Sequence, residues 1–396
     1  MRSVQLRYNF RCYPDGPQQA ALARAFGCAR VVFNDALDAR QQASAAGRWI
    51  SDAELSRRLT AAKRTAERAW LADVSAVVLQ QALADLNTAY RNFFASATGR
   101  RLGPTVGLPR FRSRNDRQSI RFTRNAHFAI TAGGRLRLPK VGAVKVVWSR
   151  PLPAEPTSVT VVRDTAGRYF VSFVVESAAD PLPEQSAQIG IARGTGTVAV
   201  LSNGATIADP EFLRQAQHRL DRARRILSRK QPGSKNQVKA RLAVAKALAA
   251  LTDTRRDWAH KQSTAIIREN QAVYIEGLPY RAKPPSRRTR STADDSWIVL
   301  TRMLGQKAAR YGRHFGKVSP TPAPGSHHPD RAARTILAAG QAESRNACGA
   351  DKRPGPVPAL GYETGTRRTR YPRQPESSLP AGARHEDAKT RTPTHR

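Results

Sequence analysis

The sequence predicts a multidomain chain of mixed α+β and α/β class. Its 396 residues exceed the size at which a single hydrophobic core usually stops growing, so two or more domains are expected. In the first half, segments with strand periodicity and segments with helix periodicity are mixed, which is typical of an α+β region. In the second half, a β-meander is followed by alternating helices and strands, which is typical of an α/β domain.

The first domain is expected to span residues 1–180 and to combine strands with a helical insertion at residues 15–100. Residues 4–13 alternate like a strand, and Asp15-Gly16-Pro17 then supplies the chemistry of a turn and a helix start. The apolar positions at helical spacing are Leu22, Phe26, Ala29, Phe33 and Leu37 in one helix and Val78, Ala82, Leu86, Ala89 and Phe93 in a second.

A loop and a β-hairpin are expected after these helices. Residues 103–128 are basic and lack a clear periodicity, which predicts a loop. Two β runs follow at residues 158–163 and 169–176, and Asp164-Thr165-Ala166-Gly167 joins them as a hairpin turn. The domain is expected to end at residues 180–184, where two prolines two residues apart oppose regular structure and indicate an inter-domain linker.

The second domain is expected to span residues 181–350. It begins with strand candidates at residues 188–191, 198–201 and 205–208, which form a meander. A helical hairpin is predicted at residues 211–268, because apolar residues three and four apart form a coiled-coil seam. The seam positions are Leu213, Ala216, Leu220, Ala223 and Leu227 in its first helix and Val238, Leu242, Ala245 and Leu248 in its second.

A short buried strand, Ala272–Glu276, and one more amphipathic helix complete the predicted elements. Residues 351–396 are rich in Pro, Gly, Thr and Arg and poor in large apolar side chains, so a disordered basic tail is expected. The apolar side of the amphipathic helix that follows the Ala272–Glu276 strand is formed by Trp297, Leu300, Leu304, Ala308 and Tyr311.

The charge of the chain points to a polyanionic partner. Lys and Arg number 67 against 30 Asp and Glu, a formal net charge of +37. No apolar run approaches the ~20 residues needed to span a bilayer, so no membrane association is expected. Because the N-terminus lacks a secretory signal and the three cysteines are scattered, a reducing cytoplasm is expected. Cys12 and Cys28 are interpreted as small buried hydrophobes.

Short motifs in a fixed order extend over roughly residues 1–350. They include Gly107-Leu108-Pro109-Arg110-Phe111, Ile189-Gly190-Ile191-Ala192-Arg193-Gly194 and Val273-Tyr274-Ile275-Glu276-Gly277-Leu278. In their order and spacing the chain resembles the OrfB/TnpB proteins of bacterial insertion sequences, relatives of the type V CRISPR effectors with a RuvC-like, RNase H-fold nuclease domain. The resemblance implies a β-barrel-like and helical N-terminal recognition lobe, then a RuvC-like domain with an inserted helical hairpin. It also implies a bacterial, nucleoid-associated location.

The resemblance further implies a metal-dependent nuclease centre built from three acidic residues. In that family these acids lie on the first strand, at the end of the fourth strand and at the start of a late helix. Acids are needed there because carboxylates must neutralise the paired divalent cations. The first position here is Ala192, and a methyl group cannot bind metal. The second is Glu276, which would also suit an ordinary strand edge. The third falls at Pro329 on strict alignment, with Asp330 one residue away and equally suited to a helix first turn.

The four-cysteine zinc ribbon that the family places before this late helix is missing. Gly316-Lys317-Val318 leads through a proline-rich stretch to His327-His328, which we interpret as part of a polar loop. Cys348 alone cannot complete a tetrahedral zinc site. No zinc and no metal ligands are therefore expected, and Mg²⁺ is expected only if nuclease activity remains.

Nucleic-acid binding is expected from displayed cations, which need no exact metal geometry. A basic stretch with one aromatic side chain suits phosphates and exposed bases, although a solvated basic loop would look the same. The tip of the helical hairpin carries a second basic cluster, and there too a solvated face is the alternative. The candidate residues are Arg110, Phe111, Arg112, Arg114 and Arg117 in the loop and Arg225, Arg229, Lys230 and Lys235 at the tip.

Three functions remain open from the sequence. The first is a TnpB-like protein that binds a guide RNA and a double-stranded DNA target without efficient cleavage, with base pairing supplying the sequence information. The second is a divergent, transposition-associated nuclease that recruits Asp330, Asp209 or another acid to a weak metal site. The third is a decayed insertion-sequence product with no retained role.

Overall fold

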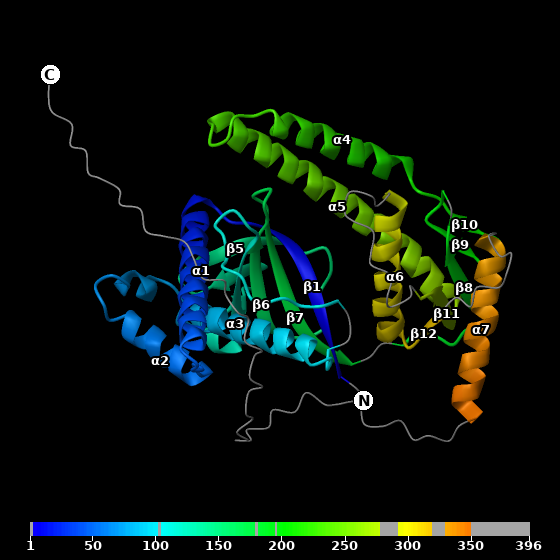
Figure 1. Ribbon diagram of the computed structural model, residues 1–396, viewed down its shortest axis with the longest axis horizontal. Helices are drawn as coiled ribbons and strands as arrows, with labels where there is room; N and C mark the ends of the chain where they lie inside the picture. Colours follow the sequence, from blue (N-terminus) through cyan, green and yellow to red (C-terminus); the bar gives the residue numbers. More distant parts are fainter. Residues whose placement is uncertain are drawn as a thin grey trace, which may run out of the picture. The chain divides into compact units, whose positions relative to one another are not determined.

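The computed structural model describes residues 3–101, 104–178, 181–194, 196–277, 292–318 and 329–349. The expected tail at 351–396 and the His327-His328 pair lie outside these residues. Residues 1–346 form one compact unit, and it contains two separate sheets with their helices (Figure 1). Among the described helices, none is both long enough and apolar enough to pass through a lipid bilayer.

The first sheet has seven strands in the order β2-β6-β7-β1-β5-β4-β3, and every pairing is antiparallel. The sheet is an open half-barrel, because its two edge strands, β2 and β3, do not pair with each other. Its strands are β1 (Ser3–Tyr13), β2 (Gln118–Thr123), β3 (Ala129–Ile130), β4 (Arg135–Leu138), β5 (Gly142–Val147), β6 (Pro156–Arg163) and β7 (Tyr169–Ala178).

Helices pack against one face of this sheet and share its core. They are α1 (Gly16–Ala45), α2 (Asp52–Ala62), the 3-10 helix η1 (Ala69–Asp73) and α3 (Ala76–Ala97). Helix α1 begins where Asp15 and Gln18 form a reciprocal capping box. Tyr8, Phe10 and Cys12 of β1 are buried in this core, with Phe10 only 2 % exposed. On α1 all five predicted apolar positions are buried. On α3, Val78, Ala82 and Leu86 are buried as predicted, and Ala89 and Phe93 are half-buried.

The loop predicted for residues 103–128 is wrong in its last third. Strand β2 occupies Gln118–Thr123 and buries Ile120 and Phe122. The alternation contains only two apolar residues, on either side of Arg121, and is therefore a weak signal; the Arg121 side chain reaches Asp85 of α3. Strands β3, β4 and β5 were also missed, because short strands with one buried face and one basic face give little hydrophobic signal.

The second sheet has five strands in the order β10-β9-β8-β11-β12. Strands β8, β9 and β10 form the predicted antiparallel meander, and β11 pairs in parallel with both β8 and β12. The strands are β8 (Gln188–Arg193), β9 (Ala199–Leu201), β10 (Thr206–Ile207), β11 (Ala272–Glu276) and β12 (His314–Val318), and the helices that follow them are α4 (Glu211–Ser228), α5 (Lys235–Glu269), α6 (Thr292–Tyr311) and α7 (Pro329–Gly349).

Helices α4 and α5 form the expected antiparallel hairpin, but the seam predicted for α5 is wrong. On α4 the predicted positions are correct, with Leu213 and Leu220 buried. On α5 the predicted Val238, Leu242 and Leu248 are 62 %, 43 % and 43 % exposed. The inward positions of α5 are instead Ala240, Val244, Ala247 and Leu251. Two sets of apolar residues spaced three and four apart overlap on this helix, and the set with the larger side chains faces outward.

The segment expected to be a linker is held in place where it is described. The backbone N–H of Leu182 donates to the carbonyl oxygen of Tyr311 at 3.2 Å. Arg313 is 7 % exposed and donates to the carbonyl oxygen of Pro183 at 2.7 Å and to that of Ile267 at 3.2 Å. Because a buried guanidinium needs all its partners, this arginine fixes the path of the chain into β8.

Cys12 and Cys28, the two cysteines whose side chains the structure describes, are buried as predicted, and we expect them to be chemically inert. Burial raises the pKa of Cys12 to about 12 and also raises that of Cys28. At pH 8 only about one Cys12 thiol in ten thousand would be the reactive thiolate. Iodoacetamide should therefore modify neither residue in the folded protein, and both should react in urea, as measured by peptide mass spectrometry. Rapid labelling of Cys12 under native conditions would contradict this burial.

Candidate functional site

The candidate site lies where β8 and β11 end side by side. These strands run in parallel, and their last registered pair is Ile191 with Ile275. One residue further along each strand stand Ala192 and Glu276, the first two of the three positions expected to hold acids. The structure therefore brings these two positions together, at the carboxyl ends of neighbouring parallel strands.

Ala192 is part of an apolar cluster beneath helix α7. Its side chain is 1 % exposed, and it packs in a group that includes Val318 of β12 and Ala333 and Ile336 of α7. Gly190, two residues earlier on the same face, allows α7 to approach the strand closely. Position 192 is thus filled by hydrocarbon, where the family resemblance implies a metal ligand.

Glu276 is half-buried and faces an open cleft of about 600 Å³. One oxygen of its carboxylate accepts a 3.3 Å hydrogen bond from the backbone N–H of Arg193. The Arg193 guanidinium forms an ion pair with Asp294 of α6. The other residues around the cleft are Gly194, Gly196, Thr197, Asp209 and Ala293.

Asp209 is the third carboxylate of this cleft. Burial raises its pKa above the usual range, and the nearby charges of Arg214 and Arg255 oppose that shift. One of its carboxylate oxygens is buried without a hydrogen-bond partner. Arg255 of α5 is itself mostly buried and lies 3.4 Å from Asp295. With three carboxylates and one guanidinium, the cleft has a net charge of −2 in a strongly basic protein.

Sequence reasoning named Glu276 and Asp209 but missed Asp294 and Arg193. The acidic pair Asp294-Asp295 belongs to the first turn of α6, where acids favour the helix dipole. That location is a common one for structural acids, so the sequence alone offered no reason to select them. Arg193 directly follows Ala192 and was interpreted only as part of the motif.

The described residues do not fit a pair of divalent cations. A buried methyl group occupies position 192, and the Arg193 guanidinium brings a positive charge to the cleft that Glu276 faces. Among the described parts of the chain, no three His, Cys, Asp or Glu side chains converge as metal ligands. Asp330 lies in the first turn of α7, three residues before Ala333, and its side chain is outside the description. The same is true of the chain between β12 and α7, where the zinc ribbon would stand.

The loop candidates for nucleic-acid binding divide into two groups. Arg110, Phe111, Arg114 and Arg117 are exposed, Phe111 by 53 %. Arg112, in contrast, is turned inward. Its guanidinium stacks 3.8 Å from the centre of the Phe33 ring and lies 3.2 Å from Asp85. Its backbone exchanges two hydrogen bonds with the Asn34 side chain.

We expect the Arg112 side chain to stabilise the folded protein and the exposed Arg114 side chain to contribute little to its stability. The Arg112→Ala change removes the stacking on Phe33 and the ion pair with Asp85, so the free energy of unfolding should fall by about 1–2 kcal/mol. The Arg114→Ala change should alter it by less than about 0.5 kcal/mol. Urea denaturation followed by circular dichroism measures both values. Equal effects of the two substitutions would mean that the stacked geometry contributes nothing.

The hairpin candidates cluster where α4 turns into α5. Arg225 is in the last turn of α4, Arg229 and Lys230 are in the turn, and Lys235 begins α5. All four are exposed. The structure therefore presents them together at one tip, as the sequence suggested, while the loop candidates belong to the first sheet and its helices.

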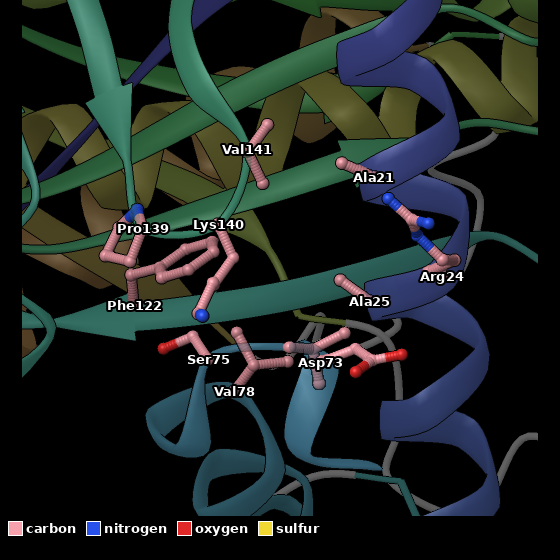
Figure 2. A pocket seen from close by; sticks show the side chains of 11 residues that line it. Ala21, Arg24, Ala25, Asp73, Ser75, Val78, Phe122, Pro139, Lys140 and Val141 are labelled. Carbon is pink, nitrogen blue, oxygen red and sulfur yellow. The ribbon is translucent and has the colours of Figure 1, made fainter. Parts of the chain in front are cut away.

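A hollow between α1, the start of α3 and the β4–β5 turn is too small for a ligand. Figure 2 shows its lining, which includes Ala21 and Arg24 of α1, Ser75 before α3, and Lys140 of the turn. Its volume is about 10 Å³, near the minimum that holds one water molecule. It is a packing gap of the first core.

Comparisons with known proteins agree with the sequence motifs. A family model described as "Probable transposase" (OrfB_IS605) matches residues 171–283, and one described as a helix-turn-helix domain matches residues 1–48. In this structure those first residues form β1 and the single long helix α1. A Streptomyces pristinaespiralis protein named "Putative RNA-guided DNA endonuclease" is 42% identical over 321 residues, 80% of this chain and 77% of that protein.

A second relative, "Putative RNA-guided DNA endonuclease InsQ" of Escherichia coli (strain K12), is 28% identical over 79% of this chain and 80% of its own. Among solved structures, a Cas12f1–sgRNA–target DNA complex aligns with a TM-score of 0.46 at 12% identity, over 80% of this chain and 90% of that chain. The identity and coverage of the Streptomyces relative, together with the family model, decide the assignment. The chain belongs to the IS605 OrfB/TnpB family of insertion-sequence proteins.

Proposed function

We propose that this protein is an RNA-guided DNA-binding protein of an insertion sequence that has lost efficient DNA cleavage. The relatives are named as RNA-guided DNA endonucleases. The proposed loss of cleavage is supported by one observation: the methyl group of Ala192 is buried in an apolar cluster at the position where the first metal-binding carboxylate is expected. Guide RNA and double-stranded DNA would be the partners, and base pairing would supply the sequence information.

In this proposal the second sheet is a RuvC-like domain. Its first and fourth strands, β8 and β11, are parallel neighbours, and the positions implied by the resemblance stand together at their ends. Helix α7 follows β12 and covers the same face. Such a centre needs one acidic residue from each of β8, β11 and α7. Of the residues at these three positions, Glu276 of β11 is the acid whose side chain the structure describes.

The exposed cations would hold nucleic acid even without cleavage. Electrostatic capture depends on the number of phosphates neutralised and tolerates small changes in geometry. Arg110, Arg114 and Arg117 with the exposed Phe111 ring are suited to a nucleic-acid backbone and an unpaired base. The hairpin tip supplies a second set of exposed cations. The protein would then act as a programmable blocker of its target.

A second candidate, a divergent metal-dependent nuclease, is favoured by one observation. Asp209 lies in the same cleft as Glu276 and has a buried carboxylate oxygen without a partner. An incoming cation would satisfy that oxygen. The Arg193 guanidinium in the same cleft argues against this candidate, because its ion pair with Asp294 takes one carboxylate away from the set that could hold a cation.

The two candidates are separated by purifying the protein from its native host and sequencing the RNA and DNA that accompany it. Guide-like RNA, together with binding of a matched plasmid and no strand scission in Mg²⁺ or Mn²⁺, is the result we expect. Scission that Glu276→Gln abolishes would establish the nuclease instead. A protein that folds poorly and brings no RNA would indicate a decayed product.

A further inference from the structure

The solvent face of strands β1, β5 and β4 gathers cations from three neighbouring strands. Arg135 of β4 stands directly opposite Lys145 of β5, and Lys145 stands opposite Tyr13 of β1. Arg135, Lys145 and Tyr13 are all exposed, as is Arg137. The alternating partners on these strands, such as Leu136 and Val144, are buried in the core. The strands therefore have one apolar face and one basic face.

This arrangement is unfavourable for the protein alone. Like charges directly opposite each other on adjacent strands repel, and Arg135 and Lys145 form such a pair. No acid stands nearby in sequence to relieve them. Between residues 117 and 154 the chain has eight basic residues and no acidic residue. A polyanion lying across the face would relieve the repulsion, since each cation would gain a phosphate.

Aromatic rings lie on the same face, so the face can bind a nucleic-acid base as well as the phosphates that its cations attract. The Tyr13 side chain is 54 % exposed at the end of β1. The Arg11 guanidinium, two residues earlier on the same face, lies 5.4 Å from the centre of the Tyr13 ring and 4.8 Å from that of Phe170 on β7. Arginine and aromatic side chains on an open sheet face are the groups on which unpaired bases stack.

We propose that this basic sheet face, formed by Arg11, Tyr13, Arg135, Arg137 and Lys145, binds a single-stranded segment of nucleic acid. The cations contact its phosphates, and Tyr13 stacks on one unpaired base. The inference deepens the proposed function, on which it rests, by assigning a strand state and a surface beyond the loop and the hairpin tip. A paired duplex would leave the exposed ring unused, and a membrane surface would demand more apolar side chains than the face carries.

The charge part is tested by salt dependence. Fluorescence anisotropy with a labelled 12-nucleotide single-stranded RNA, its DNA equivalent and the matching duplex gives the slope of log affinity against log salt. For the single strands, Arg135→Ala with Lys145→Ala should make the slope shallower by about 1.4, since each phosphate contact contributes about 0.7. Arg57→Ala with Arg64→Ala removes the same charge from exposed positions at α2 and just after it, and should leave the slope unchanged. Equal slopes in both double variants would overturn the inference.

The stacking part is tested at Tyr13. Tyr13→Ala should weaken single-strand binding about tenfold, Tyr13→Phe should not, and duplex binding should be the same in all three proteins. Equal losses for duplex and single strand would overturn the assignment to unpaired bases. The assay needs no guide RNA, so it can succeed while guided targeting fails. If the wild type binds guide and target but ignores all these substitutions, the proposed function stands and this surface is excluded.

Discussion

Replacing Ala192 by Asp is expected to restore metal-dependent DNA cleavage. The new carboxylate would enter beside Glu276 at the ends of parallel strands, where two acids can share a cation. On a plasmid matched to the co-purifying RNA, scission in Mn²⁺ should rise at least about 100-fold over wild type, equivalent to about 2.7 kcal/mol in the barrier. Adding Glu276→Gln to the Ala192→Asp protein should remove the gain.

The matched control is Ala192→Asn, which has nearly the same volume but no charge. Both substitutions bury a polar group in the cluster under α7, and in chelator the Asp variant should be the less stable of the two, because it adds a negative charge beside Glu276. Mn²⁺ should then raise the melting temperature of the Ala192→Asp protein only, because a bound ion stabilises the folded state. Efficient cleavage by the wild type, or equal activity of both variants, would show that position 192 does not limit the reaction.

Replacing Gly190 by Ala is expected to dislodge helix α7. An added Cβ would lie 2.7 Å from the backbone nitrogen of Leu337 and closer still to the carbonyl oxygen of Ala333. Both obstacles are backbone atoms of a regular helix, so they cannot rotate aside as a side chain would. We expect the free energy of unfolding to fall by about 3 kcal/mol, and hydrogen exchange to accelerate across α7 before the rest of the chain.

Gly27→Ala provides the matched control for this substitution. Gly27 is in the interior of α1, and an added Cβ there meets nothing within 4 Å. Alanine is the better helix former by about 1 kcal/mol, so this change should stabilise the protein slightly. If Gly190→Ala were as well tolerated as Gly27→Ala, helix α7 would not pack on β8 as described.

The sequence predicted the order of most elements, because long periodic segments determine them. The helices around Leu22 and Leu86 and the five-residue strand at β11 were recognisable from spacing alone. Only part of the candidate site was recognisable from the sequence. Motif order selected Ala192 and Glu276, but nothing in the sequence indicated that Arg193 would turn toward Asp294 in the cleft that Glu276 faces. Side-chain pairings between distant segments depend on the packing of the whole domain.

The error on α5 has a specific cause. The helix carries two sets of apolar residues spaced three and four apart, and the predicted set with Val238 and Leu242 has the larger side chains. The set that faces α4 contains Ala240 and Ala247, whose small side chains let the two helices approach closely. Size alone therefore selects the wrong face in a hairpin with a narrow interface.

The central position of β1 in the first sheet has a consequence for synthesis on the ribosome. This strand is translated before its neighbours β5 and β7, which end at residues 147 and 178. At roughly 5–20 residues per second, β1 would wait roughly ten to thirty seconds for β7 to emerge. Until then its unpaired edges are open to other chains, so chaperone capture of the nascent protein should depend on the β1 segment.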